Sequence, residues 1–137
     1  MNVWALLIGT MLAIFAVIRF KKTGFEKKGW FYPLVLASFP VFYWVFALYA
    51  SDFGALLGEI AFSLIYFAIA FIAFRRRNTV TSVILAIGFI SHAVYDGMHH
   101  AIFVNAGTPL WWPEFCGSAD LLFGFYLLYT SIFYKNN

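Results

Sequence analysis

Three histidines and an aspartate lie within ten residues of a chain that is otherwise strongly apolar. The stretch SHAVYDGMHH, residues 91–100, contains every histidine of the chain, with Asp96 between them. His92, Asp96 and His99 have the spacing i, i+4, i+7, and they share one face if the segment is helical. Imidazole and carboxylate groups on one face can bind a metal such as zinc, iron or manganese, or can carry protons. This face is therefore a candidate metal or proton site.

The composition indicates the class of protein that holds this face. Hydrophobic residues make up 64% of the 137 residues and charged residues 11%, whereas a soluble domain is about half apolar and about 25% charged. The apolar residues form continuous runs, and about 20 helical residues cross a bilayer core of ~30 Å. The sequence therefore predicts an all-α fold, a polytopic transmembrane helix bundle, with one domain over residues 1–137. The net charge of +3 comes from basic clusters between the runs, which favours membrane topology over nucleic-acid binding.

Five apolar runs are long enough to be spans, over residues 2–20, 31–50, 53–74, 80–100 and 116–134. The first lacks a positive leading segment and a small-x-small cleavage site, so we expect it to be a retained span. With five spans, the basic residues fall on one side of the membrane; they are Arg19, Lys21, Lys22, Lys27, Lys28, Arg75, Arg76, Arg77 and Lys135. The positive-inside rule then predicts an external N-terminus and a cytoplasmic C-terminus in a multi-pass protein of the bacterial inner (cytoplasmic) membrane.

This topology places ionisable residues of three spans at one depth. At about 1.5 Å per residue, Glu59 lies about 9 Å below the outer end of the third span and Asp120 about 6 Å below that of the fifth. His92 lies about 10 Å below His99, which is near the outer surface. A charged residue at the bilayer centre costs at least about 2.5–3.5 kcal/mol and normally faces the bundle interior or a water-filled cavity. We therefore expect these side chains to meet in an outward-facing intramembrane site.

Simpler explanations exist for each of these polar residues. His100 lies at the edge of the helical face and near the interface, where histidine is tolerated. Glu59 alone could be a protonated hydrogen-bond donor between helices, and Asp120 could cap the fifth helix. Cys116 lies four residues before Asp120, and we interpret it as a small apolar residue rather than a nucleophile. We expect the aromatic residues, 23% of the chain, to pack or to face lipid, and we assign none of them to the site.

Three functions fit this set of residues. In the first, Zn or another divalent transition metal is bound by His92, Asp96, His99 and Asp120, and Glu59 is the general base or an extra ligand. A metal-bound water, with Glu59 and Asp120 as catalytic residues, would then hydrolyse a lipid or other apolar substrate. In the second, carboxylates beside histidines share protons or cations, as in a small proton- or cation-coupled transporter. In the third, the polar groups join helices in an accessory or structural membrane subunit. The absence of an evident inverted repeat argues against a monomeric transporter. This objection is weaker if the protein is a homo-oligomer.

The last third of the chain resembles a family of small bacterial integral membrane proteins. Members carry a His-x3-Asp-x2-His element, then a Trp-x-Pro-x-Phe-Cys-type loop and an aspartate in the last span. The matching residues are His92, Asp96, His99, His100, Trp111, Trp112, Pro113, Phe115, Cys116, Asp120 and Gly124. The resemblance implies a family-wide site with no assigned activity.

A more distant similarity is to the alkaline ceramidase and adiponectin receptor superfamily of membrane hydrolases, through Ser91, His92 and Asp96. Those proteins hold zinc in a seven-helix bundle with Ser, His and Asp and a later His-x3-His pair. This chain has no His-x3-His pair and only five expected spans. The similarity makes intramembrane zinc hydrolysis conceivable without assigning it.

Overall fold

A computed structural model of the chain describes residues 2–102 and 104–134. Within these residues the protein is all-α, with no strand. The helices are α1 (Val3–Thr23), α2 (Phe31–Tyr49), α3 (Phe53–Arg76), α4 (Thr79–Ile102) and α5 (Trp112–Phe133), with a short 3-10 turn, η1 (Phe25–Lys27), after α1. All five helices are long and apolar enough to cross a membrane. The predicted all-α architecture with five candidate spans is confirmed.

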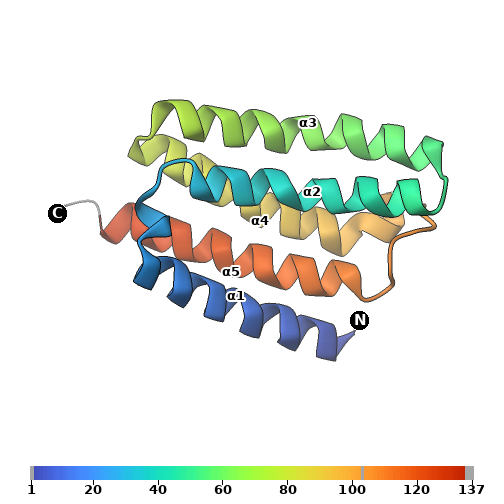
Figure 1. The fold of residues 1–137 in the computed structure, drawn as a ribbon, viewed down its shortest axis with the longest axis horizontal. Helices are drawn as coiled ribbons and strands as arrows, with labels where there is room; N and C mark the ends of the chain where they lie inside the picture. Colours follow the sequence, from blue (N-terminus) through green and yellow to red (C-terminus); the bar gives the residue numbers. More distant parts are fainter. Residues whose placement is uncertain (1, 103, 135–137) are drawn as a thin grey trace.

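The helices run antiparallel in chain order and form a bundle (Figure 1). α4 packs most extensively against α5, α1 lies against α5, and α2 pairs with α3, which also contacts α4. The α1–α2 and α3–α4 connections lie at one end, which carries Lys27, Lys28 and Arg75–Arg77 and is called the basic end. The α2–α3 and α4–α5 connections lie at the opposite end. Lys135, which also supports the predicted orientation, is outside the described residues.

Side-chain caps fix where several helices begin. The Asn2 side chain accepts a hydrogen bond from the Ala5 backbone N–H, and Asp52 accepts one from Ala55 at 2.9 Å. At the start of α4, Asn78 and Thr81 exchange hydrogen bonds between side chain and backbone, at 2.9 and 3.1 Å, as in a capping box. These caps satisfy backbone N–H groups that a helix start would otherwise leave unpaired.

The start of α5 differs from the prediction in a way that matters for the site. The apolar run predicts a start near residue 116, but the helix begins at Trp112, with Pro113 in its first turn. Proline suits this position because it has no N–H to satisfy. Asp120 consequently lies more than two turns inside α5, so it does not cap that helix.

α4 and α5 approach closely at Gly124. A Cβ atom added there would lie 2.6 Å from Cγ1 of Ile90 and 3.0 Å from the Ala86 carbonyl oxygen. We predict that Gly124→Ala lowers the free energy of unfolding by about 1–3 kcal/mol because the helices must move apart. Gly97→Ala is the control, since a Cβ at Gly97 meets nothing within 4 Å and alanine favours a helix by up to about 1 kcal/mol. Unfolding of both variants in mixed detergent measures the difference, and equal stabilities would contradict the close approach.

Candidate metal centre

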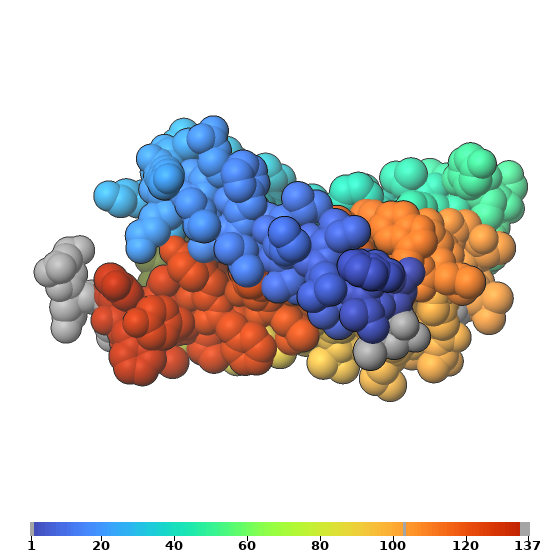
Figure 2. Space-filling view, turned by 90° about the horizontal axis from the view of Figure 1, so that it is seen from below, coloured from blue at the N-terminus to red at the C-terminus, as the bar shows by residue number. Residues whose placement is uncertain are grey.

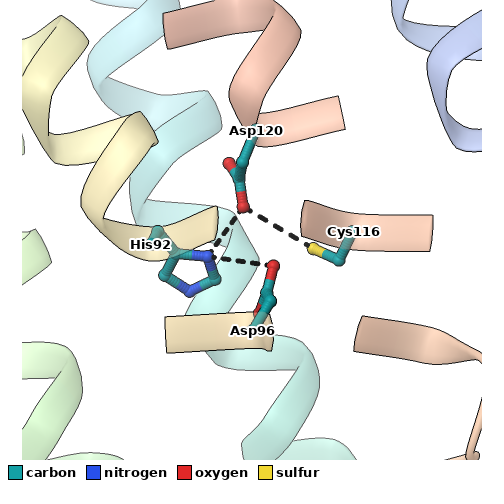
Figure 3. A group of neighbouring side chains, drawn as sticks. All are labelled: His92, Asp96, Cys116 and Asp120. Atoms are coloured by element: carbon teal, nitrogen blue, oxygen red, sulfur yellow. Dashed lines mark hydrogen bonds and ion pairs between the residues drawn. The ribbon is translucent and has the colours of Figure 1, made fainter. Parts of the chain in front are cut away.

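Four potential metal ligands from two helices converge near the middle of the bundle. His92 and Asp96 come from α4, and Cys116 and Asp120 from α5 (Figure 3). The His92 Nδ1 atom lies 2.7 Å from Oδ2 of Asp120 and 3.5 Å from Oδ2 of Asp96. The Cys116 Sγ atom lies 3.9 Å from the same Asp120 oxygen. One ligand atom from each residue lies within 4.8 Å of the other three, and these four residues are called the His92 group.

The His92 group is shielded from solvent and only partly hydrogen-bonded. His92 and Asp120 are 0% exposed, Asp96 1% and Cys116 2%. Within the described residues, Nε2 of His92, Oδ2 of Asp96 and Oδ1 of Asp120 have no hydrogen-bond partner. Buried polar atoms of this kind are rare in folded proteins, and an ion is one of their common explanations. The combination of donor types and short distances fits a metal ion.

Helical spacing and a small residue bring the four ligands together. His92 and Asp96 are four residues apart on α4, as are Cys116 and Asp120 on α5, so each pair shares a face. Gly117 allows the two faces to meet, because a Cβ atom at this position would lie 3.3 Å from Cβ of Asp96. The predicted meeting of the fourth and fifth helices at this level is confirmed.

A second buried cluster surrounds Glu59 of α3. Its Oε1 atom lies 2.7 Å from Nε2 of His99, and it accepts a hydrogen bond of 3.2 Å from Nδ2 of Asn105. The Tyr95 hydroxyl donates to the other oxygen, Oε2. Glu59, His99, Tyr95 and Asn105 are called the Glu59 group, and each is at most 5% exposed. The third helix therefore joins the polar layer, as predicted.

Tyr43 of α2 connects the two groups. Its hydroxyl donates a hydrogen bond of 2.7 Å to Oδ1 of Asp96 in the His92 group. Its ring stacks on the His99 imidazole, with centroids 4.1 Å apart and planes 18° apart. Its backbone carbonyl accepts a hydrogen bond from Asn105 at 3.1 Å. Four helices, α2 to α5, thus build one continuous buried polar layer.

The structure divides the residues that the sequence singles out. His92, Asp96 and Asp120 come together, whereas His99 lies with Glu59 in the second group. His100 is exposed. Interpreting Cys116 as a small apolar residue is incomplete, because its sulfur belongs to the His92 group.

The expectation that no aromatic residue contributes to the site is wrong for Tyr43 and Tyr95. Tyr95 has a sequence signal, since it lies three residues after His92 and four before His99 and so near their face. Tyr43 has none, because its neighbours in α2 are mostly apolar. Asn105 lies in the α4–α5 connection, where polar residues are ordinary.

A groove in the surface of the bundle lies beside the His92 group. It has a volume of about 710 Å³.

The groove lies between α1, α4 and α5, and its lining is mostly apolar. The residues that line it include Leu6, Thr10, Asp96, His100, Glu114 and Phe125. Figure 2 shows the face on which α1 (blue) lies across α5 (red), with part of α4 at the edge. Asp96 belongs both to this lining and to the His92 group, so the groove ends beside the candidate metal ligands, whose side chains are buried.

Comparisons of the chain with protein-family models, with curated proteins and with solved structures gave no match. Its class therefore follows from its own structure. Over the residues that the structure describes, the chain is all-α with five helices suited to span a membrane, and it contains a buried His/Asp/Cys group that could hold a metal ion.

Proposed function

We propose that this membrane protein binds a divalent transition metal through the His92 group and uses it to hydrolyse a lipid or another apolar substrate. The observation that carries the proposal is the convergence of four donor atoms within 4.8 Å at a fully buried position. Two carboxylates buried side by side are costly unless they are paired or coordinate an ion. A divalent cation offsets their charge.

The types of donor favour zinc. The group offers one imidazole nitrogen, one sulfur and two carboxylates, and zinc accepts all three kinds of ligand. Magnesium and calcium prefer oxygen ligands alone, so the cysteine disfavours them. Cys116 thus joins the expected ligands His92, Asp96 and Asp120, and His99 is left to the Glu59 group.

Hydrolysis is supported by the groove that reaches Asp96. A catalytic zinc site generally has three protein ligands and one open position, where bound water forms hydroxide near neutral pH. Of the four donors, His92, Cys116 and Asp120 would hold the metal, and Asp96, which lies at the groove, would leave the fourth position to water. Glu59 is the candidate general base because its group adjoins the His92 group through Tyr43, which contacts Asp96 and His99. A bound water would have to carry the proton between the groups, since ring stacking transfers none.

The same proposal includes an orientation and a location. The basic end would face the cytoplasm of a bacterial cell and the opposite end the outside of its inner membrane, following the positive-inside rule. The resemblance to small bacterial membrane proteins supports this location. Lipid would cover the apolar side chains exposed along the helices, and a homo-oligomer would cover part of them.

Metal analysis of detergent-purified protein tests the proposal. We expect about one zinc ion per chain in the wild type, and binding at least about tenfold weaker in His92→Ala, because a direct ligand is lost. His100→Ala is the matched control: it removes a histidine of the same stretch that lies outside the His92 group. A wild type without stoichiometric metal, or equal metal content in the two variants, would overturn the proposal.

Proton or cation transport is the second candidate, favoured by the contacts between both buried histidines and carboxylates. It predicts flux through liposomes that contain the purified protein, with a large loss in Asp120→Asn. Flux that is indifferent to this substitution would count against transport.

An accessory subunit would instead show a crosslinked partner, and removal of the ionisable groups would disturb its assembly.

A further inference from the structure

A second cavity lies at the basic end, at the opposite end of the bundle from the α4–α5 connection. It has a volume of about 410 Å³ and is lined by parts of η1, α2, α3, α4 and α5. The polar residues that line it include Lys27, Lys28, Tyr32, Arg77, Ser82 and Ser131. A neighbouring cavity of about 270 Å³ shares Lys27 and Tyr32 and adds Lys21. The cavities therefore collect cations and hydroxyl groups from separate parts of the chain.

The Tyr32 hydroxyl is the second observation that points to a ligand. Tyr32 is 5% exposed and lines both cavities. Within the described residues its hydroxyl oxygen has no hydrogen-bond partner. A buried hydroxyl without a partner costs about 1–3 kcal/mol. A phenol O–H can donate to an anion in the cavity, which would remove this cost.

The charges around Tyr32 favour an anion. Lys21, Lys27, Lys28 and Arg77 line the two cavities, against one carboxylate, Glu26. That carboxylate accepts a hydrogen bond of 2.5 Å from the Tyr126 hydroxyl.

Arg77 is held in place at the cavity by its neighbours. Its Nε donates to the Phe74 carbonyl at 3.1 Å, and its side chain passes over Gly29, where a Cβ would lie 2.7 Å from Nε. The guanidinium is thereby fixed beside the cavity.

We propose that this cavity binds the phosphate of an anionic phospholipid headgroup. Helix ends of a membrane bundle lie at headgroup depth, and basic pockets between such helices bind acidic lipids. The apolar walls formed by Ala73, Leu85 and Leu127 suit the start of the acyl chains, which distinguishes a lipid from free phosphate. The site shares no residue with the His92 group, so it stands independently of the proposed hydrolysis.

Native mass spectrometry of the detergent-purified protein, titrated with dioleoyl phosphatidylglycerol or dioleoyl phosphatidylcholine, tests the site. We expect preferential binding of phosphatidylglycerol. Tyr32→Phe should weaken it about tenfold, because a hydrogen bond to a charged group is lost. Lys27→Gln/Lys28→Gln should weaken it at least as much. Arg75→Gln/Arg76→Gln is the matched control, since it removes two charges from the same end outside the cavity.

Two results would overturn the proposal. Equal weakening by the two double variants, with no effect of Tyr32→Phe, would show that only diffuse surface charge attracts the lipid. Binding of inorganic phosphate alone, without a preference for phosphatidylglycerol, would show that the ligand is a free anion. Circular dichroism of each variant confirms that the helices are intact.

Discussion

Replacing Cys116 by serine should weaken zinc binding about 100-fold, or about 2.7 kcal/mol, and should remove the thiolate charge-transfer absorption of the cobalt-loaded protein. The sulfur lies 3.9 Å from Oδ2 of Asp120 and within 4.8 Å of a ligand atom of each other residue in the His92 group. Thiolate is the softest donor of the four and favours zinc over the harder divalent metals. Zinc titration and cobalt absorption spectra measure the two effects.

The chain provides an internal control for this experiment. Cys116 is its only cysteine, so a thiolate band in the cobalt-loaded protein has no other source. His100→Ala should keep both the band and the zinc affinity. Unchanged zinc affinity in Cys116→Ser would exclude the thiolate from the ligand set and leave His92, Asp96 and Asp120 as the ligands.

The number and type of helices could be predicted because hydropathy identifies each apolar run that is long enough to cross a bilayer, and each such run forms one helix. The ends of the helices could not be predicted as well, because hydrogen bonding and caps determine them. α5 extends back to Trp112 around Pro113, and α1 continues through charged residues to Thr23. For the same reason, hydropathy placed Asp120 in a span but could not say at which turn of the helix it lies.

The fixed rise of a helix made it predictable that Glu59, His92, Asp96 and Asp120 would join one polar layer, but Glu59 lies at the level of His99 and Asp120 at the level of His92. The grouping of His99 with the metal ligands was less well founded. His92 and His99 lie about 10 Å apart along the helix axis, whereas zinc binds its ligands at about 2.0–2.3 Å. Two residues on one helical face can therefore belong to different sites, and His99 contacts Glu59 instead.

The roles of Tyr43 and Cys116 depend on how helices pair, which hydropathy does not encode. Tyr43 contacts Asp96, which is 53 residues away in the sequence. An apolar run predicts that a helix is buried in lipid or protein, but it does not predict which neighbour the helix meets. The spacing of Cys116 and Asp120 showed that they share a face, yet only the packing of α5 on α4 shows what that face contacts.

Glu59→Ala should lower the free energy of unfolding by about 3–5 kcal/mol, because it leaves the partners of a buried ionic group unsatisfied. His99, Tyr95 and Asn105 all contact the Glu59 carboxylate. Unfolding in mixed detergent measures the loss. Glu114→Ala is the control: this half-buried carboxylate accepts a hydrogen bond from the Asn2 backbone N–H near the bundle surface, so its removal should cost less than that of Glu59. Similar losses in the two variants would contradict the Glu59 group.

Glu59→Gln separates a structural role of this residue from a catalytic one. Glutamine retains one acceptor oxygen, which can accept from Tyr95 or from Asn105 but not from both, so the protein should stay folded with a smaller loss of stability than Glu59→Ala. Glu59 is outside the His92 group, and zinc content should therefore stay at the wild-type level. If Glu59 is the general base, hydrolysis falls while zinc remains bound, because a neutral amide accepts no proton. Loss of zinc from a folded Glu59→Gln protein would instead make Glu59 a metal ligand and would merge the two groups into one site.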